Sequence, residues 1–342
     1  MNPPLVVFES RPWAAVGVQL TVVSLRRHLP GSPIWVSTPG ASRALSDWLA
    51  NQPGVVVRPS EHLATSGWEV KPAALLEVLA DTPEAVWVDS DIVATAPLDR
   101  LLLGDDDDVL VATEETCYGQ AQGGTHRTEA WGLPVGRSMP STVNTGVVRV
   151  TRRHVDLLEA WRSMLHSPTF VDAQARPWDE RPLHLLSDQE VLTALLGSRD
   201  FAGVPLRLLR RGRDIAQCFG PAGFTPSERL RRRALPPLVH AMGVKPWAPP
   251  DPSAARGRAR WRARYDRAHC ELEPYGWVAA RYADEVDQDL GWTSARHATA
   301  RVMSKLTGDH PVYRELPLAV VDAAVRSARR GLSIGRFALE GT

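Results

Sequence analysis

The sequence predicts an α/β protein with a mainly parallel sheet flanked by helices, followed by a mostly helical C-terminal extension. Short apolar runs alternate with amphipathic stretches along the first two-thirds of the 342 residues, a pattern typical of parallel strands joined by helices. Beyond Ala248 the composition shifts to a proline-rich break and then an arginine-rich stretch. We therefore expect two domains, residues 1–248 around the sheet and residues 249–342 as the extension.

Each element follows from its local pattern. Short apolar runs bounded by polar residues predict strands at 4–10, 32–38, 54–60, 85–93, 108–113 and 142–150. Apolar residues spaced three or four positions apart predict helices at 17–30, 42–51, 71–83, 153–165 and 187–198. The last of these helices has its own signals, because Ser187 and Glu190 fit a capping box and Gly197 fits a C-terminal stop. Residues 167–187 are rich in proline and polar side chains and are expected to be irregular.

Composition excludes several classes of protein. The net charge of +1 gives no general attraction to a polyanion, so nucleic acid is not an expected partner. The first eleven residues lack the pattern of a signal peptide, and no uncharged apolar run approaches the length of about 18 residues that spans a bilayer. Cys117, Cys218 and Cys270 have no paired spacing, which indicates reduced thiols and a cytoplasmic location.

Two carboxylates interrupt the apolar run "AVWVDSDIV" at residues 85–93. Alternate residues of an extended chain point to the same side, so Asp89 and Asp91 are predicted to address one point at the carboxyl end of their strand. Converging carboxylates repel each other unless a cation lies between them, and Mg²⁺ or Mn²⁺ binds such pairs together with substrate phosphates. The spacing favours a metal–diphosphate site; the alternative is a turn capped by Asp91 beside a solvated Asp89.

The stretch "VHAMGVKPW" offers three groups that suit the same chemistry. His240 supplies an imidazole that Mn²⁺ accepts beside carboxylates. Gly243 allows close backbone approach to a ligand, and Lys245 supplies a compact charge for phosphate. A buried histidine and a turn lysine would explain the same residues. Only three of the 40 basic residues are lysines, which suggests that Lys71 and Lys245 are needed as ammonium groups.

Two further polar motifs are open to a structural and a functional interpretation. Asn144 and Gly146 in "NTG" are typical of a turn, but an amide beside a glycine could also bind sugar hydroxyls. Asp188 at a helix start favours the helix dipole. Together with Gln189 it could instead place a carboxylate and an amide at a pocket wall.

The order of these motifs (Lys71, D-S-D, N-T-G, D-Q-E and H-x-x-G-x-K-P-W) resembles that of the family 8 glycosyltransferases. This family includes glycogenin and the bacterial lipopolysaccharide galactosyl- and glucosyltransferases. The resemblance covers roughly residues 1–248 and implies a GT-A fold with a Rossmann-like sheet. It implies a retaining transfer of a hexose from a nucleoside-diphosphate sugar, usually a UDP-sugar. Departures are Ala241 in place of an aromatic residue, a gap between Gly243 and Lys245 one residue shorter than expected, and the first-strand exit "FESR".

The resemblance also implies a role for each motif residue. Mn²⁺ or Mg²⁺ would bind Asp89, Asp91 and His240. The catalytic pair would be Asp188 and Gln189, beside the donor sugar. The donor nucleotide-sugar would contact Phe8, Glu9, Ser10, Lys71, Asp89, Ser90, Asn144, Gly146, Gly243 and Lys245, the first three at the nucleobase and the last two at the diphosphate.

Two other functions stay open. A sugar-phosphate nucleotidyltransferase uses a similar sheet and metal, but "FESRPWAAVG" lacks the glycine-rich basic loop that such enzymes carry after the first strand. The stretch 256–267, in which arginines interleave with Trp261 and Tyr265, suits either a non-catalytic basic-surface binding protein or a solvated helix face.

The acceptor is not identified by the sequence and could be a glycan, a lipid-linked sugar or a small molecule. Residues 167–187 and the C-terminal extension are the expected acceptor surfaces, because loops carry specificity. The amphipathic helix at 316–330 either lies on a membrane surface or packs on the catalytic domain. Peripheral membrane contact and a homodimer are both left open.

Overall fold

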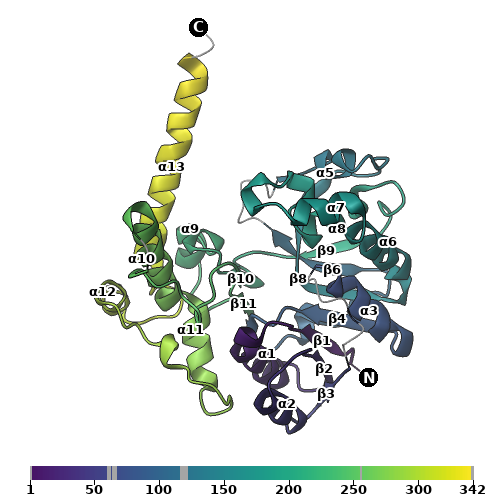
Figure 1. Ribbon diagram of the computed structural model, residues 1–342, viewed down its shortest axis with the longest axis horizontal. Coiled ribbons are helices and arrows are strands. Elements are labelled where there is room, and N and C mark those ends of the chain that lie inside the picture. Colours follow the sequence, from purple (N-terminus) through teal and green to yellow (C-terminus); the bar gives the residue numbers. More distant parts are fainter. Residues whose placement is uncertain (1, 60–62, 64–67, 116–121, 255, 340–342) are drawn as a thin grey trace.

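The computed structural model describes residues 2–59, 63, 68–115, 122–254 and 256–339, with residues 329–339 described by their backbone alone. Cys117 lies outside these ranges, whereas Cys218 and Cys270 are buried. The predicted α/β architecture is confirmed: a central sheet lies between helices, and further helices follow it (Figure 1).

The central sheet has eight strands in the order β3-β2-β1-β4-β8-β6-β9, and β7 pairs with β8. The strands are β1 (Leu5–Phe8), β2 (Ile34–Ser37), β3 (Val55–Val57), β4 (Glu84–Val88), β6 (Leu110–Glu115), β7 (Gln122–Gly124), β8 (Met139–Thr151) and β9 (Leu206–Leu209). Among these strands β8 alone runs against its neighbours. The sheet is thus mainly parallel, as predicted, with one long reversed strand.

Alternation along the strands divides the core between the two faces of the sheet. Leu5 and Val7 of β1 pack towards α1 and α2, whereas Val6 and Phe8 pack in the core that contains α3, α6 and α8. The helices of these layers are α1 (Ala15–His28), α2 (Arg43–Ala50), α3 (Val70–Asp81), α6 (Val155–Leu165) and α8 (Asp188–Gly197). Apolar faces at helical spacing therefore meet apolar strand faces on both sides.

The run 85–93 is not one strand, so this prediction was wrong. The chain turns at Asp89–Asp91, where the Ile92 backbone N–H donates to the Asp89 carbonyl at 3.1 Å. The next strand, β5 (Ile92–Ala94), leaves for a second sheet of order β10-β11-β5, with β10 (Ile215–Gln217) and β11 (Leu238–His240). The apolar residues on either side of the turn pair in different sheets. The carboxylates of Asp89 and Asp91 therefore do not lie inside a sheet, where desolvation of their charges would be costly.

The segment 167–187 is more regular than predicted. It contains α7 (Pro168–Gln174), capped by Ser167, and short 3₁₀ turns. Three other short helices are α4 (Asp99–Leu102), α5 (His126–Ala130) and α9 (Pro226–Leu230).

The predicted cap signals of α8 act differently. The Ser187 hydroxyl donates to the Glu190 carboxylate at 2.7 Å and makes no cap hydrogen bond to the backbone. Gly197 ends the helix without a positive φ. It is required for close packing, because a Cβ there would lie 2.4 Å from Thr128 Oγ1.

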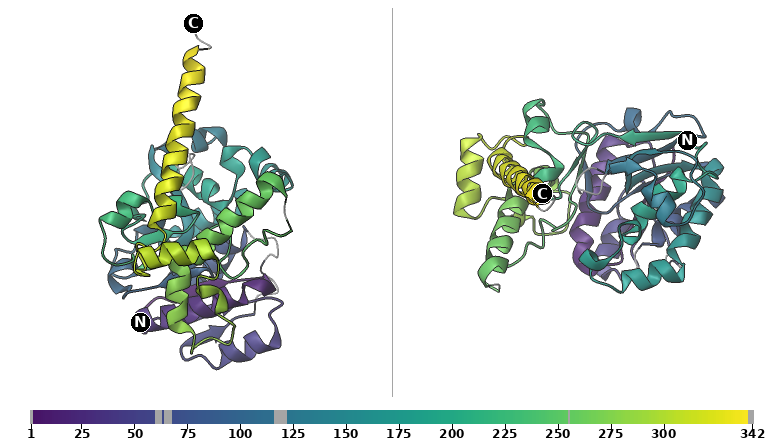
Figure 2. Two further views of the ribbon diagram at one scale, coloured as in Figure 1. Left: turned by 90° about the vertical axis from the view of Figure 1, so that its left-hand side faces the viewer. Right: turned by 90° about the horizontal axis from the view of Figure 1, so that it is seen from above.

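The C-terminal extension is mostly helical, as predicted. Its helices are α10 (Gly257–Leu272), α11 (Pro274–Ala279), α12 (Ala298–Leu306) and α13 (Leu316–Leu339). Tyr275 and Val278 of α11 share an apolar core with Val93 and Val239 of the smaller sheet and with α1. The extension therefore lies on the side of the smaller sheet (Figures 1 and 2).

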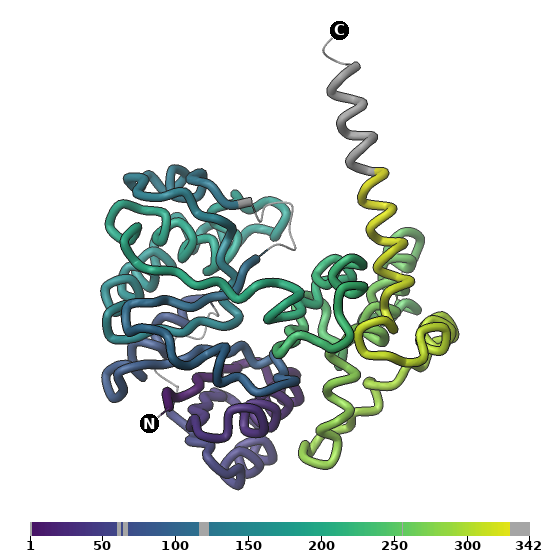
Figure 3. The backbone as a smooth tube through the Cα atoms, turned by 180° about the vertical axis from the view of Figure 1, so that it is seen from behind, coloured from purple at the N-terminus to yellow at the C-terminus, as the bar shows by residue number. Residues whose placement is uncertain are grey.

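In Figure 3 the chain crosses from the larger sheet to these helices through the green segment that holds β10 and β11. The boundary at residue 248 stays a prediction. Among the described helices, none combines the length and the apolar character needed to cross a membrane.

Candidate active site with a metal-ligand cluster

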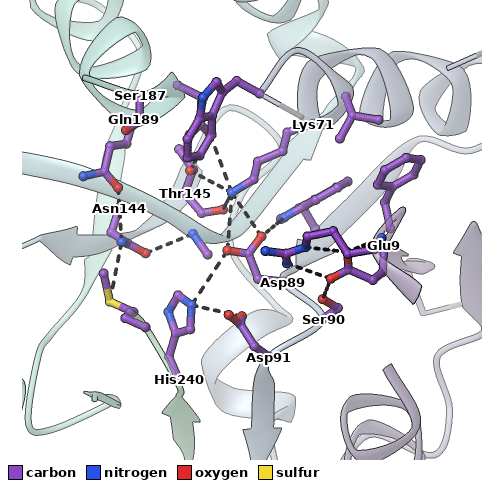
Figure 4. A pocket seen from close by; sticks show the side chains of 18 of the residues that line it. Glu9, Lys71, Asp89, Ser90, Asp91, Asn144, Thr145, Ser187, Gln189 and His240 are labelled. Atoms are coloured by element: carbon purple, nitrogen blue, oxygen red, sulfur yellow. Dashed lines mark hydrogen bonds and ion pairs between the residues drawn. The ribbon is translucent and has the colours of Figure 1, made fainter. Parts of the chain in front are cut away.

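A cavity of about 490 Å³ opens where β1 and β4 end and where α8 begins. It is lined by every residue that the sequence patterns singled out for the site. These are Phe8, Glu9, Ser10, Lys71, Asp89, Ser90, Asp91, Asn144, Gly146, Asp188, Gln189, His240, Gly243 and Lys245. Figure 4 shows how several of them point into one space from different elements. Their chemical roles stay predictions.

Asp89, Asp91 and His240 form a metal-ligand cluster. Each offers one ligand atom, and these atoms lie within 4.8 Å of one another. His240 Nε2 lies 3.1 Å from Asp91 Oδ1 and 3.8 Å from Asp89 Oδ2. The turn after β4 supplies the carboxylates and β11, the antiparallel partner of β5, supplies the imidazole. Two carboxylates and an imidazole suit a divalent cation such as Mn²⁺.

A buried oxygen at this cluster supports a cation. Asp91 Oδ1 is buried and makes no hydrogen bond of good geometry with the described residues, and His240 Nε2, 3.1 Å away, is itself one of the candidate ligand atoms. A buried carboxylate oxygen in this position carries a desolvation cost that a bound cation would offset. The residues present thus fit a divalent metal ion, which would also bring the Asp89 and Asp91 carboxylates together without repulsion.

Gly146 makes room for the imidazole. On β6, Ala112 pairs with Val148 and the next residue, Thr113, pairs with Asn144, so residues 145–147 of β8 bulge out of that ladder. A Cβ at Gly146 would lie 2.7 Å from His240 Cε1. The Gly146 carbonyl also accepts from the Asp89 backbone N–H at 2.8 Å. The "NTG" motif is therefore a bulge that seats the metal-ligand cluster, rather than a turn.

Lys71 lies at the first turn of α3 and is buried. Its Nζ is 3.0 Å from Asp89 Oδ1 and 3.6 Å from Asp188 Oδ2, and it donates to Thr145 Oγ1 at 3.0 Å. Burial alone would lower the pKa of Lys71, but the carboxylates of Asp188 and Asp89 outweigh it and raise the pKa. The ammonium group therefore stays charged between a predicted metal ligand and Asp188.

Asp188 is held from two sides. The Thr145 hydroxyl donates to its Oδ2 at 2.6 Å, and Lys71 Nζ lies 3.6 Å from the same oxygen. Burial raises the pKa of Asp188, and Lys71 opposes that rise. Thr145 is a functional candidate that the sequence patterns did not single out, although it lies inside the "NTG" motif.

A second set of hydrogen bonds orients the amide of Gln189. Asn144 Nδ2 donates to Gln189 Oε1 at 3.2 Å and to Glu115 Oε2 at 3.0 Å. The side-chain oxygen Oδ1 of Asn144 accepts from the Gly146 backbone N–H at 3.0 Å. Asn144 thus orients the amide of Gln189, and Glu115 orients Asn144 in turn. No sequence motif indicated Glu115.

Lys245 lies against Asp91 on the other side of the cluster. It donates to an oxygen of that carboxylate and to the Ala241 carbonyl. Burial opposes ionisation of Asp91, but Lys245 and His240 outweigh it and hold the pKa of Asp91 well below its usual range. Gly243 has a φ of +73°, which explains the glycine in the loop before Lys245.

Both carboxylate oxygens of Glu9 are occupied. Arg11 donates to Oε1 from Nε at 2.8 Å, and the Ser90 hydroxyl donates to Oε2 at 2.6 Å. Arg11 lines the cavity with a side chain that is 49% exposed. Arg11, whose Nε and Nη2 both donate to Glu9, therefore lies at the predicted nucleobase end. No sequence pattern singled it out, although it stands in the unusual exit "FESR".

No protein-family model and no curated protein sequence matches this chain. Solved structures with a similar fold include "galactosyltransferase LgtC in complex with donor and acceptor sugar analogs", at 16% identity and a TM-score of 0.47, over 83% of this chain and 100% of that one. The WbbM bifunctional glycosyltransferase matches at 15% identity and a TM-score of 0.46, over 72% of this chain. Mouse xyloside xylosyltransferase 1 matches at 15% identity and a TM-score of 0.44, over 71% of this chain and 98% of that one. The chain spans 47% of the length of WbbM. At these similarities, function has to be inferred from the side chains of the site.

Proposed function

We propose that this protein is a metal-dependent glycosyltransferase that moves a hexose from a nucleoside-diphosphate sugar, UDP-sugar by preference, to an acceptor hydroxyl with retention at the anomeric carbon. The observation that carries the proposal is the metal-ligand cluster of Asp89, Asp91 and His240, which faces the same cavity as the buried Lys71 and the half-buried Lys245. Motif order, as in the family 8 glycosyltransferases, supports the same conclusion.

The charges of the cavity suit a diphosphate. Three carboxylates (Asp89, Asp91 and Asp188) face two ammonium groups (Lys71 and Lys245). The site alone therefore carries about one net negative charge and would repel an anionic donor. A divalent cation reverses the sign, and the site then attracts the diphosphate. The donor and the metal ion are expected to bind together.

The chain's own residues provide the remaining parts of the reaction. The anomeric C–O bond to the β-phosphate breaks, and a metal ion bound beside that phosphate would stabilise the charge that develops on it. Lys245 faces the same charge with its ammonium group. The acceptor oxygen forms the new bond on the face that the phosphate leaves, and the departing phosphate takes the acceptor's proton.

Asp188 is proposed to position the donor sugar rather than to attack it. Its Oδ2 accepts a hydrogen bond from Thr145 and lies against Lys71, so that oxygen is not free for attack. Gln189, oriented by Asn144, would present its amide to the sugar hydroxyls. Near-normal turnover of a well-folded Asp188→Asn variant would contradict the positioning role.

The test is a panel of UDP-, GDP- and dTDP-sugars offered to the purified protein with Mn²⁺, Mg²⁺ or EDTA. Thermal shift and nucleotide release are the two readouts. We expect one nucleotide class to raise the melting temperature and to be hydrolysed slowly, only with metal. Absence of any response across the panel would overturn the proposal. Asp47→Asn, on the exposed face of α2, is the matched control for Asp188→Asn and should behave as the wild type.

A further inference from the structure

Trp178 lies at the cavity and is exposed rather than packed in a hydrophobic core. Trp178 follows Pro177 in a short 3₁₀ turn and is 44% exposed, yet it lines the cavity. An indole this large usually lies in a core or at an interface, because it buries more apolar area than any other side chain. Its exposure at the wall of a polar cavity therefore indicates a ligand.

Trp178 is held in place rather than left free. The guanidinium of Arg181 lies over its ring, 5.5 Å from the centroid. That guanidinium donates to the carbonyls of Arg176, Gln174 and Leu186 at 3.0, 3.1 and 3.3 Å. An aromatic platform that is fixed before binding loses little conformational freedom when a ligand arrives.

A second tryptophan belongs to the same structure. The Gln174 side-chain oxygen accepts from Arg181 at 2.5 Å and from Trp68 Nε1 at 3.0 Å. Trp68 also lines the cavity. Hydrogen bonds join Trp68, Gln174 and Arg181, and the Trp178 ring contacts the Arg181 guanidinium; we call these four residues the indole wall. It joins α7 and the turn after it to the segment that leads into α3.

We infer that the indole wall binds the acceptor of the proposed transfer and that this acceptor is an uncharged pyranoside. The inference rests on the proposed function. The segment that carries Trp178 leads directly into Ser187, Asp188 and Gln189, where the donor sugar is predicted. A ligand on the wall would then lie beside the anomeric carbon, as an acceptor must.

The chemistry of the wall favours a sugar. A pyranose ring presents an apolar C–H face that stacks on an indole, and its hydroxyls need hydrogen-bond acceptors. Asp179 and Glu180, both exposed, follow Trp178 and offer carboxylates for those hydroxyls. The same carboxylates would repel an acceptor that carries a phosphate.

The experiment uses the full chain with Mn²⁺ and the nucleotide found by the donor panel, and methyl glycosides of glucose, galactose, mannose, rhamnose and N-acetylglucosamine as acceptor probes. Saturation-transfer NMR measures glycoside binding, and nucleotide release measures turnover with and without each glycoside. We expect at least one glycoside to bind and to accelerate release. Trp178→Ala should weaken the binding of that glycoside about tenfold.

Two further variants separate stacking from folding. Trp178→Phe keeps an aromatic face and should retain most glycoside binding. Trp261→Ala removes an indole that is 71% exposed on α10, outside the cavity lining, and should change nothing. If no methyl glycoside binds while the nucleotide does, the inference fails and the proposed function stands. If Trp178→Ala weakens nucleotide binding but not glycoside binding, the wall stacks the nucleobase and the inference is overturned. If neither nucleotide nor glycoside binds, both fail.

Discussion

Two charge clusters in the described part of the protein have opposite designs. The cavity cluster (Lys71, Asp89, Asp91, Asp188, His240 and Lys245) lines the cavity. The core cluster (Arg229, His269, Glu273 and Glu315) ties α9 to the start of α13 through α10. In the core cluster Glu315 contacts both Arg229 and His269, and His269 Nε2 lies 3.0 Å from Glu273 Oε2.

The difference is one of balance. In the core cluster each cation meets a carboxylate, and Glu315 and Glu273 outweigh burial and raise the pKa of His269 to about 10. In the cavity cluster three carboxylates share two ammonium groups, which leaves one negative charge in excess. Excess buried charge costs stability unless it is paired. We infer that the core cluster serves the fold and that the cavity cluster awaits a cation.

The largest effect is expected in the core cluster. Glu315→Gln removes the carboxylate that Arg229 and His269 share, which leaves buried cations without a partner. The free energy of unfolding should fall by about 3–5 kcal/mol, measured by urea denaturation. Nucleotide release by the folded variant should stay normal. A loss below about 1 kcal/mol, within the scatter of ordinary substitutions, would contradict the role given to this cluster.

The next effect concerns the cavity cluster and appears in activity. Asp91→Asn keeps the shape of the side chain but removes a predicted metal ligand. Metal-dependent nucleotide release should fall on the order of a hundredfold to a thousandfold, whereas the urea midpoint should move less than in Glu315→Gln. Turnover within a factor of about two of the wild type would remove Asp91 from the metal site.

The pH dependence of stability should come from the core cluster. The pKa of His269 is about 10 in the fold and 6.5 as an ordinary value, so the folded protein holds this proton more tightly. The resulting stability is fully present below pH 6.5 and is lost as the pH rises through 10. The wild type should lose stability between pH 6.5 and 10, measured by urea denaturation across this range, and His269→Gln should show a flatter curve. Equal slopes would contradict the assignment.

The smallest effect tests the seat of the imidazole. Gly146→Ala places a Cβ against His240 and should weaken Mn²⁺ binding about tenfold, because overpacking of about 1–3 kcal/mol must be relieved by moving the ring. Calorimetric titration with Mn²⁺ measures this affinity. Gly203→Ala is the matched control, since a Cβ added at that glycine would meet no atom within 4 Å. Equal Mn²⁺ affinity in both variants would show that the ring does not depend on Gly146.

Patterns within single segments were enough to predict six strands of the larger sheet and its main helices, but not β7 or β9. Asp89, Asn144, Asp188 and His240 line the cavity, and the order of their motifs together, rather than any motif alone, singled them out. What the sequence did not reveal depends on partners far along the chain. The turn at Asp89–Asp91 exists because β5 pairs with β11, and nothing in "AVWVDSDIV" encodes that partner.

The same limit applies to contacts between distant residues. Glu9 stays a predicted nucleobase contact, but nothing in its motif indicated that Ser90, 81 positions away, donates to its carboxylate. Trp178 was one of twelve tryptophans until its exposure and its place at the cavity were known. Local spacing cannot report such long-range contacts, because they arise only when the sheets pack.

The turn at Asp89–Asp91 has a mechanical consequence. Asp89 follows β4 of the larger sheet, whereas His240 ends β11 of the smaller one. An ion held by both would fasten the two sheets together, so its binding and their packing would be thermodynamically linked. At a concentration about 100 times its dissociation constant the ion would add about 2.7 kcal/mol to the stability of the joined state. Strain introduced at α11, which packs on the smaller sheet, would then weaken metal affinity although no metal-ligand residue is changed.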